Sequence, residues 1–382
     1  MVLVKQTRKG MGTELGVYLA VAPDHVDSAK RAIAACLAWL AEVEATLTRF
    51  DDGSELCRLN AAAGEWRPVS ALLYAVVEQA VAAARASGGL FDPTLLARLE
   101  SLGYDRDYKA IARRETAGAQ GKGATTSATR GHAAAHTQRA KDKPDGAWRD
   151  IQFDEARRWI RLPRGCQFDL GGIAKGWVAD AALERCFAAH PNVIVDVGGD
   201  MRVRGVADDG APWPIGVSAS RDVAGRPAPE QPVVALRQGA IATSGANNRW
   251  WFRNGQRQHH LLDPRTGQPA RVWIADDRDD QNVAGDPQSL IAAATALAPT
   301  AAHAEVAAKV ALLRGYPQAL RNVEAAWDAW LAQAADDGRV VTPYHDAGVA
   351  LMLTLGTGEV VASSNMQAYL ETLGGGGDVW LS

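Results

Sequence analysis

DLGGIAKG, residues 169–176, is the most distinctive stretch of this 382-residue sequence. Gly171 and Gly172 permit backbone angles and close approaches that a Cβ atom would block. The residues after them predict a helix, whose N-terminal N–H groups, together with the charge of Lys175, suit a phosphate or pyrophosphate. The spacing matches neither a Walker A loop nor GxGxxG, which argues against a P-loop or Rossmann site. Taken alone, a structural glycine turn with a solvated lysine explains the stretch equally well.

Predicted strands and helices alternate on both sides of this stretch. NVIVDVGGD, residues 192–200, predicts a buried strand that ends in glycines, and ATSG, residues 242–245, has the same form. Residues 289–297 are ambiguous because their alanines favour a helix. Thr300 is expected to cap a helix over residues 301–313. The alternation predicts an α/β to α+β fold.

A histidine pair opens the stretch HHLLDPRTGQP, residues 259–269. This stretch is typical of a strand that runs into a turn. A histidine on a strand beside an Asp-Pro turn can act as an acid, a base or a phosphate donor. A histidine exposed to solvent on an edge strand is an equally good interpretation.

Composition and charge exclude several classes of protein. Lys and Arg number 41 against 44 Asp and Glu, a formal net charge of −3, which argues against a strongly basic nucleic-acid binder. No apolar run approaches the ~18 residues of a membrane span, and the first residues lack the apolar core of a secretory signal. The four cysteines show no CxxC spacing and are expected to be reduced. We therefore expect a soluble, cytoplasmic protein.

Residues 112–147 differ in composition from the rest of the chain. They are rich in Ala, Gly, Thr, Lys and Arg, contain no apolar residue larger than Ala, and have seven basic and three acidic residues. We expect a disordered surface insertion. His132 and His136 lie four residues apart within it, but no Cys or acidic ligand accompanies them, so a zinc site is not expected.

Seven motifs occur in an order that resembles the FAD:protein FMN transferase family, also called the ApbE family. They are MGT (11–13), FDDGSELCRLN (50–60), FDPT (91–94), DLGGIAKGWVAD (169–180), VDVGGD (195–200), ATSG and HHLLDPRTGQP. The resemblance covers residues 11–313 and extends more weakly to about residue 370. It implies a flavin-binding fold of mixed sheets with flanking helices, in one domain over residues 1–371 interrupted by the insertion. Residues 372–382 form a tail.

The resemblance also implies an activity. In this family a metal-activated FAD is attacked at its FMN phosphate by a threonine hydroxyl of a target flavoprotein, FMN becomes attached and AMP leaves. Some relatives hydrolyse FAD to FMN and AMP instead. The expected partners are therefore FAD and a target flavoprotein, without nucleic acid. Two alternatives stay open: an FAD-binding protein without transferase activity, and an FAD pyrophosphatase.

The resemblance places a set of residues at the family's FAD contacts. They are Met11, Phe50, Leu90, Phe91, Asp92, Asp169, Lys175 and His260, with Thr243 and Ser244 as further contacts. Phe50 stands where many members have tyrosine, so the ring is kept and the hydroxyl is lost. His260 and Lys309 are the candidate catalytic residues.

The expected magnesium site departs from the family pattern. The carbonyl of Gly172 matches a ligand position, but Glu305 stands at the family's Asp and Lys309 at its Thr, and Ala308 replaces a second Asp found in some members. Magnesium prefers oxygen ligands, and an ammonium repels it. Either Lys309 is a surface residue paired with Glu305, four residues earlier, or its ammonium occupies the region of the metal. The same alignment implies that residues 289–297 form a strand.

Overall fold

The computed structural model describes residues 1–112, 146–217, 232–247, 249–274, 288–321, 348–370 and 379–381. Nearly all of the predicted insertion and most of the predicted tail, with His132 and His136, lie outside these residues. The chain forms two compact units. The first comprises Met1–Glu44, Gly171–Asn247 and Arg271–Ser382, and the second Ala45–Leu170 and Asn248–Ala270. The expectation of one domain over residues 1–371 stays a prediction.

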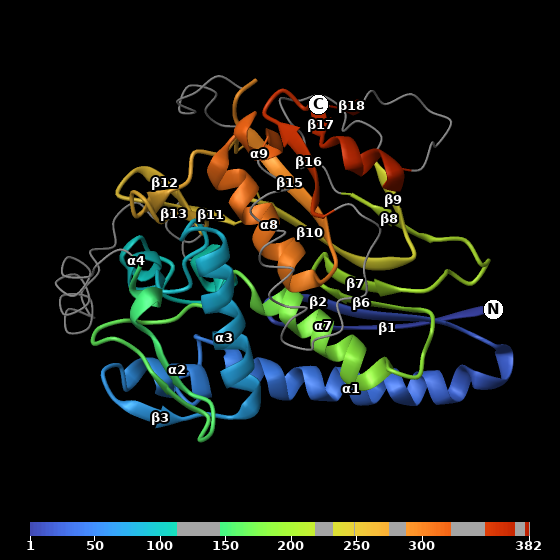
Figure 1. Ribbon diagram of the computed structural model, residues 1–382, viewed down its shortest axis with the longest axis horizontal. Helices are drawn as coiled ribbons and strands as arrows, with labels where there is room; N and C mark the ends of the chain where they lie inside the picture. Colours follow the sequence, from blue (N-terminus) through green and yellow to red (C-terminus); the bar gives the residue numbers. More distant parts are fainter. Residues whose placement is uncertain are drawn as a thin grey trace, which may run out of the picture. The chain divides into compact units, whose positions relative to one another are not determined.

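A nine-stranded sheet forms the framework of the first unit (Figure 1), in the order β1-β2-β6-β7-β10-β15-β16-β17-β18. Neighbours are antiparallel except β17 and β18. This pairing makes the fold α+β. The strands are β1 (Val2–Gly10), β2 (Thr13–Val21), β6 (Val193–Val197), β7 (Asp200–Arg204), β10 (Gln238–Gly245), β15 (Ile291–Ala298), β16 (Ala350–Leu355), β17 (Val360–Ala362) and β18 (Val379–Leu381).

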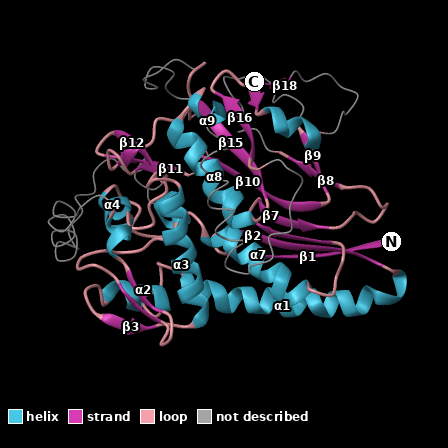
Figure 2. Cartoon of the chain, viewed as in Figure 1, coloured by secondary structure: helices cyan, strands magenta, loops and turns pink. Residues whose placement is uncertain are grey.

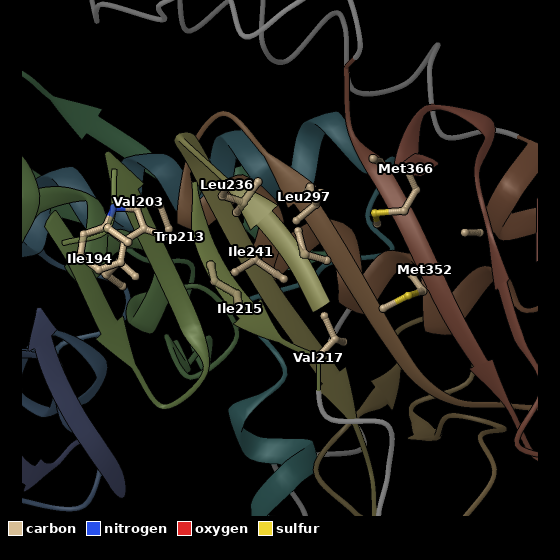
Figure 3. Packing of buried hydrophobic residues seen from close by; sticks show 14 of the residues in the cluster. Ile194, Val203, Trp213, Ile215, Val217, Leu236, Ile241, Leu297, Met352 and Met366 are labelled. Carbon is tan, nitrogen blue, oxygen red and sulfur yellow. The ribbon is translucent and has the colours of Figure 1, made fainter. Parts of the chain in front are cut away.

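The two faces of this sheet are covered differently (Figure 2). Helices α7 (Ala174–Phe187) and α8 (Ala301–Arg314) pack on one face, α7 over β6 and β7 and α8 over β10 and β15. The hairpin of β8 (Trp213–Gly216) and β9 (Val233–Leu236) packs on the other. There Trp213 and Ile215 meet Ile241 and Leu297 in a buried apolar cluster (Figure 3). Among the residues that the structure describes, the unit also contains α1 (Val26–Leu47), whose last residues belong to the second unit, α9 (Gln318–Arg321), and two short 3-10 helices at Pro23–His25 and Ser364–Tyr369.

Strand β15 confirms the strand expected at residues 289–297 and overrides the helix propensity of its alanines. All eight of its residues are buried. Leu297 faces the β8–β9 hairpin, so alternation along the strand leaves Ala294 and Ala296 for the face on which α8 packs. Small side chains there let the helix approach closely, and burial on both faces outweighs local propensity.

The second unit is built from short elements. In its described residues the α-helices are α2 (Glu55–Ala61), α3 (Ala71–Ala86) and α4 (Leu96–Ser101), and a 3-10 helix covers Ala147–Asp150. One sheet joins β3 (Trp66–Pro68), β5 (Trp159–Arg161) and β4 (Gln152–Asp154) in that order. Two strand pairs are β11 (Trp250–Arg253) with β12 (Gln256–His259), and β13 (Leu262–Asp263) with β14 (Gln268–Pro269). Ser54 and Ser70 cap α2 and α3 by accepting the N–H groups of Cys57 and Leu73. No helix in the described ranges is long and apolar enough to cross a membrane.

Helices α7 and α8 cap each other where their first turns cross. The N–H groups of Ala301 and Ala302, which open α8, donate to the two carboxylate oxygens of Asp180 from α7, at 2.8 and 3.0 Å. In return the Gly176 N–H near the start of α7 donates to Glu305 Oε2 from α8, at 2.8 Å. Buried N–H groups at a helix start need such partners, and a carboxylate there also interacts favourably with the helix dipole.

Gly176 is the point of closest approach between the two helices. A Cβ atom at this position would overlap the carbonyl of Ala301. Backbone atoms cannot rotate away as a side chain can, so the two helix starts would have to separate. The third glycine of DLGGIAKG is therefore required for helix packing, a role that the sequence did not reveal.

We predict that Gly176→Ala destabilises the protein by roughly 1–3 kcal/mol, the usual cost of overpacking. Helix propensity alone predicts the opposite, a gain of up to about 1 kcal/mol. Urea unfolding followed by circular dichroism decides between the two signs. An unchanged or raised free energy of unfolding would show that α7 and α8 are not in close contact here.

Candidate functional site

Four charged side chains meet beside the crossing of α7 and α8. Lys175 is the second residue of α7, Asp200 opens β7, and Glu305 and Lys309 lie one turn apart on α8. The Lys309 Nζ is 3.0 Å from Glu305 Oε1, and the Lys175 Nζ is 3.4 Å from the same oxygen. Lys175 also forms an ion pair with Asp200. We call these four residues the charge cluster.

The carboxylates of the charge cluster are buried beneath its ammonium groups. Asp200 is 1% exposed and Glu305 fully buried, whereas the side chains of Lys175 and Lys309 are 20% and 14% exposed. Burial raises the pKa of Asp200 to about 6, against the opposing effect of Lys175. Burial would also raise the pKa of Glu305, but Lys175, Lys309 and the Gly176 N–H hold that pKa below its ordinary value. The ammonium groups of Lys175 and Lys309 are therefore the part of the cluster that solvent reaches most.

The pairing of Lys309 with Glu305 confirms the ion pair expected from their spacing. Lys309 is not a surface residue, however, because its side chain is mostly buried. Asp200, the remaining carboxylate, was missed by sequence reasoning. Its motif VGGD forms the tight turn of the β6–β7 hairpin, with Val197 paired to Asp200, rather than the open end of a strand.

The residues at the expected magnesium site do not fit a magnesium ion. Glu305 Oε2 accepts the Gly176 N–H, and Oε1 is shared by two ammonium groups. Ala308 is buried, and its methyl side chain cannot ligate a metal ion. Within the described ranges, no three His, Cys, Asp or Glu side chains are grouped so that they could hold a metal. The carbonyl of Gly172 stays a predicted ligand, and magnesium would need further oxygen ligands beside it.

Two motifs far apart in sequence meet at the ends of neighbouring strands in the first unit's sheet. Met11 and Gly12 form the β1–β2 turn, and Met11 has φ 50°, a left-handed conformation that is uncommon for a residue with a side chain. Gly198 in the β6–β7 turn donates its N–H to Glu14 O, and a Cβ atom there would overlap Thr13. The MGT and VGGD motifs are thus neighbours. Strain at Met11 is consistent with a functional position.

The two hydroxyls of ATSG point to opposite faces of the sheet, as alternation along β10 requires. Thr243 Oγ1 lies 2.8 Å from Thr295 Oγ1 on β15. Ser244 is 7% exposed on the face that α8 covers. A ligand against one face would reach one of these side chains, and their contact with FAD stays a prediction.

Phe50 in the second unit presents an aromatic surface supported by Arg49. Phe50 is 46% exposed, and the Arg49 guanidinium lies 4.2 Å from its ring centroid and 4.6 Å from that of Tyr104. Arg49 Nη1 donates to Tyr104 O at 3.0 Å, and Nε lies 3.7 Å from Asp169 Oδ1. Arg49 Nη2 is buried without a hydrogen-bond partner in the described structure. The predicted contacts Phe50 and Asp169 are therefore linked through Arg49, which sequence reasoning missed.

Asp169 is held in place by two elements of the second unit. The Asp169 N–H donates to Pro93 O at 2.8 Å, which joins DLGG to FDPT. Asn60 donates to and accepts from the backbone of the preceding residue, Phe168, at 3.0 and 2.7 Å. These long-range bonds explain why the FDDGSELCRLN, FDPT and DLGG motifs occur together.

The FDPT motif forms a compact turn. Asp92 Oδ1 accepts the N–H of Thr94 at 2.8 Å and its hydroxyl at 2.5 Å. Burial raises the pKa of Asp92, against the effect of the Thr94 hydrogen bonds. Phe91 is 6% exposed and Leu90 is half-buried. Contacts of Leu90, Phe91 and Asp92 with FAD stay predictions.

The adjacent histidines differ sharply in environment. His259 is 4% exposed, its Nε2 lies 3.0 Å from Ala270 O, and its Nδ1 accepts the Leu261 N–H at 3.3 Å. Burial lowers the pKa of His259 to about 4. His260 is only half-buried, and its Nδ1 lies 3.3 Å from Arg249 O. A hydrogen on Nδ1 would donate to this carbonyl and leave Nε2 as the basic nitrogen of His260.

The chain is similar to a known family and to proteins with a named activity. The model of the ApbE family matches residues 11–277. A FAD:protein FMN transferase from Treponema pallidum is 33% identical over 251 residues, which cover 62% of this chain and 62% of the relative. The chain thus spans about three fifths of that relative's length.

Solved structures of the same family share the fold. The ApbE protein of Thermotoga maritima matches with a TM-score of 0.69 over 97% of this chain and 100% of the other, at 22% identity. The flavin transferase ApbE from Vibrio cholerae matches with a TM-score of 0.65 over 97% and 99%, at 21% identity. These matches confirm the predicted fold class of mixed sheets with flanking helices.

We predict that His259 makes the protein sensitive to acid. Its Nδ1 faces the Leu261 N–H, so a proton there would set donor against donor. The pKa of His259 is about 4 in the folded protein, against an ordinary value of 6.5. The contribution of the neutral ring to the free energy of unfolding is therefore fully present above pH 6.5. It falls by on the order of 3 kcal/mol as the pH is lowered toward 4. Urea unfolding at a series of pH values should show this loss in the wild type and in His260→Gln, but not in His259→Gln. Parallel pH profiles for all three proteins would refute the assignment.

Proposed function

The chain belongs to the ApbE family, and from this premise we propose that it transfers the FMN part of FAD to a threonine hydroxyl of a target flavoprotein. The threonine oxygen forms a bond to the FMN phosphorus, and the bond from that phosphorus to the bridging oxygen breaks. AMP leaves with the electron pair of that bond, and the threonine proton is passed to a base. The charge cluster is the observation that best supports this proposal.

The proposed role of the charge cluster follows from the chemistry of phosphoryl transfer. Such reactions depend mainly on positioning and on neutralising the charge of the transferred group. Lys175 and Lys309 present their ammonium groups above buried carboxylates, and the helix crossing holds them in place. We assign them to the pyrophosphate of FAD. His260 is the candidate base because it is half-buried and its Nε2 is the basic nitrogen in the tautomer favoured by Arg249 O.

The proposed flavin contacts lie in the second unit. The exposed ring of Phe50 offers a stacking surface, and Nη2 of the adjacent Arg49 is buried with no hydrogen-bond partner among the described residues. Buried donors are normally satisfied, so an unpaired one indicates a position that a bound group completes. We assign the isoalloxazine ring to this surface, with Asp169 acting through Arg49.

A second candidate function is FAD binding without transfer. The observation in its favour is that the residues at the family's metal position do not fit magnesium. A protein without metal activation could hold FAD and leave its pyrophosphate intact. The pyrophosphatase alternative, in which water replaces threonine, stays open on the same site.

We predict covalent attachment of FMN to a target flavoprotein in the presence of FAD. The protein is incubated with FAD and a flavoprotein that carries an acceptor threonine, and denatured samples are examined for in-gel flavin fluorescence. A fluorescent target band, absent when the acceptor is changed from threonine to valine, is expected. AMP release without a target would instead indicate the pyrophosphatase, and FAD binding without either product would indicate the binder.

We predict that His260→Ala lowers turnover about 10²–10⁴-fold, the usual contribution of a general base, while the melting temperature stays near that of the wild type. His259→Ala is the matched comparison, since it removes a buried ring with two hydrogen bonds and should mainly lower the melting temperature. If His260→Ala lowers the melting temperature and leaves turnover intact, His260 is structural.

A further inference from the structure

In the charge cluster, ammonium groups surround the carboxylate that would otherwise bind a metal ion. Glu305 is a fully buried carboxylate, and the groups around it are two ammonium groups and one backbone N–H. A carboxylate offers about four lone-pair positions, and three are used here. Each of the three donors comes from α7 or α8, so the helix crossing brings them to Glu305.

We propose that the ammonium of Lys309, beside that of Lys175, takes the place of the divalent cation, so that this chain binds FAD without a metal. The proposal rests on the proposed use of FAD, and it adds that the two ammonium groups neutralise the pyrophosphate without a divalent cation. It follows from the position of Lys309 Nζ, 3.0 Å from Oε1 of Glu305, the carboxylate at the family's metal-ligand position.

A magnesium ion and Lys309 compete for the same oxygen. Magnesium binds carboxylate oxygens at about 2.0–2.1 Å and requires near-octahedral oxygen coordination. An ion on Glu305 Oε1 would lie within a few ångströms of both Lys309 and Lys175, whose charges repel it. Moving Lys309 away would leave its charge in a largely buried position without its partner, which is costly.

The exposed part of the cluster suits an anion. Solvent reaches Lys175 and Lys309 more than either carboxylate. Two ammonium groups on neighbouring helices can donate charge-assisted hydrogen bonds to phosphate oxygens. One ammonium supplies less positive charge than a divalent ion, so activation of the AMP leaving group is expected to be weaker than with a metal.

Calorimetry and FAD titration test this proposal without relying on turnover. Three proteins are compared: the wild type, Lys309→Thr, and Lys30→Thr as a matched control on the exposed face of α1. FAD affinity is measured by fluorescence quenching in EDTA and in magnesium, and magnesium alone is titrated by calorimetry. Thermal melting confirms that each variant is folded, and Lys309→Thr leaves Glu305 paired with Lys175.

The expected result is equal FAD affinity in EDTA and magnesium for the wild type and for Lys30→Thr, with no heat of magnesium binding. Lys309→Thr should weaken FAD binding in EDTA by about tenfold or more, the cost of losing a charged hydrogen bond. The double variant Glu305→Asp with Lys309→Thr should regain affinity on addition of magnesium.

Three results would overturn the proposal, and they are distinguishable from one another. Wild-type FAD binding that requires magnesium would refute replacement of the metal while leaving the proposed transfer intact. Absence of FAD binding by the wild type in either buffer would refute the proposed function and this inference together. Equal affinity of Lys309→Thr and wild type in EDTA would also remove Lys309 from the site.

Discussion

The reciprocal capping of α7 and α8 is the constraint on which the first unit depends. Each helix begins inside the protein, where its first N–H groups cannot reach water, and each takes a carboxylate from the other helix: Asp180 for α8 and Glu305 for α7. The exchange is possible only because Gly176 lets the two helix starts approach within backbone contact. Loss of either carboxylate would leave buried N–H groups unpaired, so the helix crossing requires both Asp180 and Glu305.

This constraint also determines what Glu305 can do chemically. One of its oxygens is used as a helix cap and the other as the shared partner of Lys175 and Lys309. Glu305 stands at a metal-ligand position of the family pattern, but in this chain it caps a helix and pairs with two ammonium groups. The lysines, in turn, are oriented by a carboxylate that cannot move without opening the helix crossing. The cationic surface proposed for the pyrophosphate is consequently preorganised by the fold.

Local features of the fold could be predicted from the sequence, whereas the partners within the site could not. Thr300 was recognisable as a helix cap because a cap and its N–H groups lie within four residues. The pairing of Lys309 with Glu305 is local in the same sense. Asp200 reaches its partner Lys175 across 25 residues, and Asp180 reaches Ala301 and Ala302 across more than 100. Arg49 likewise reaches Asp169 across more than 100 residues. Strand β15 was predictable only through the resemblance, because its burial on both faces is a property of the assembled sheet.

A crystal structure of the FAD complex grown with manganese, in which Mn²⁺ stands in for Mg²⁺ and is located by its anomalous signal, tests the central claim most directly. The account predicts Lys309 Nζ within about 3 Å of a pyrophosphate oxygen, the distance of a charge-assisted hydrogen bond, and no manganese peak beside Glu305. A manganese ion bound between Glu305 and the pyrophosphate, with Lys309 turned away, would contradict it.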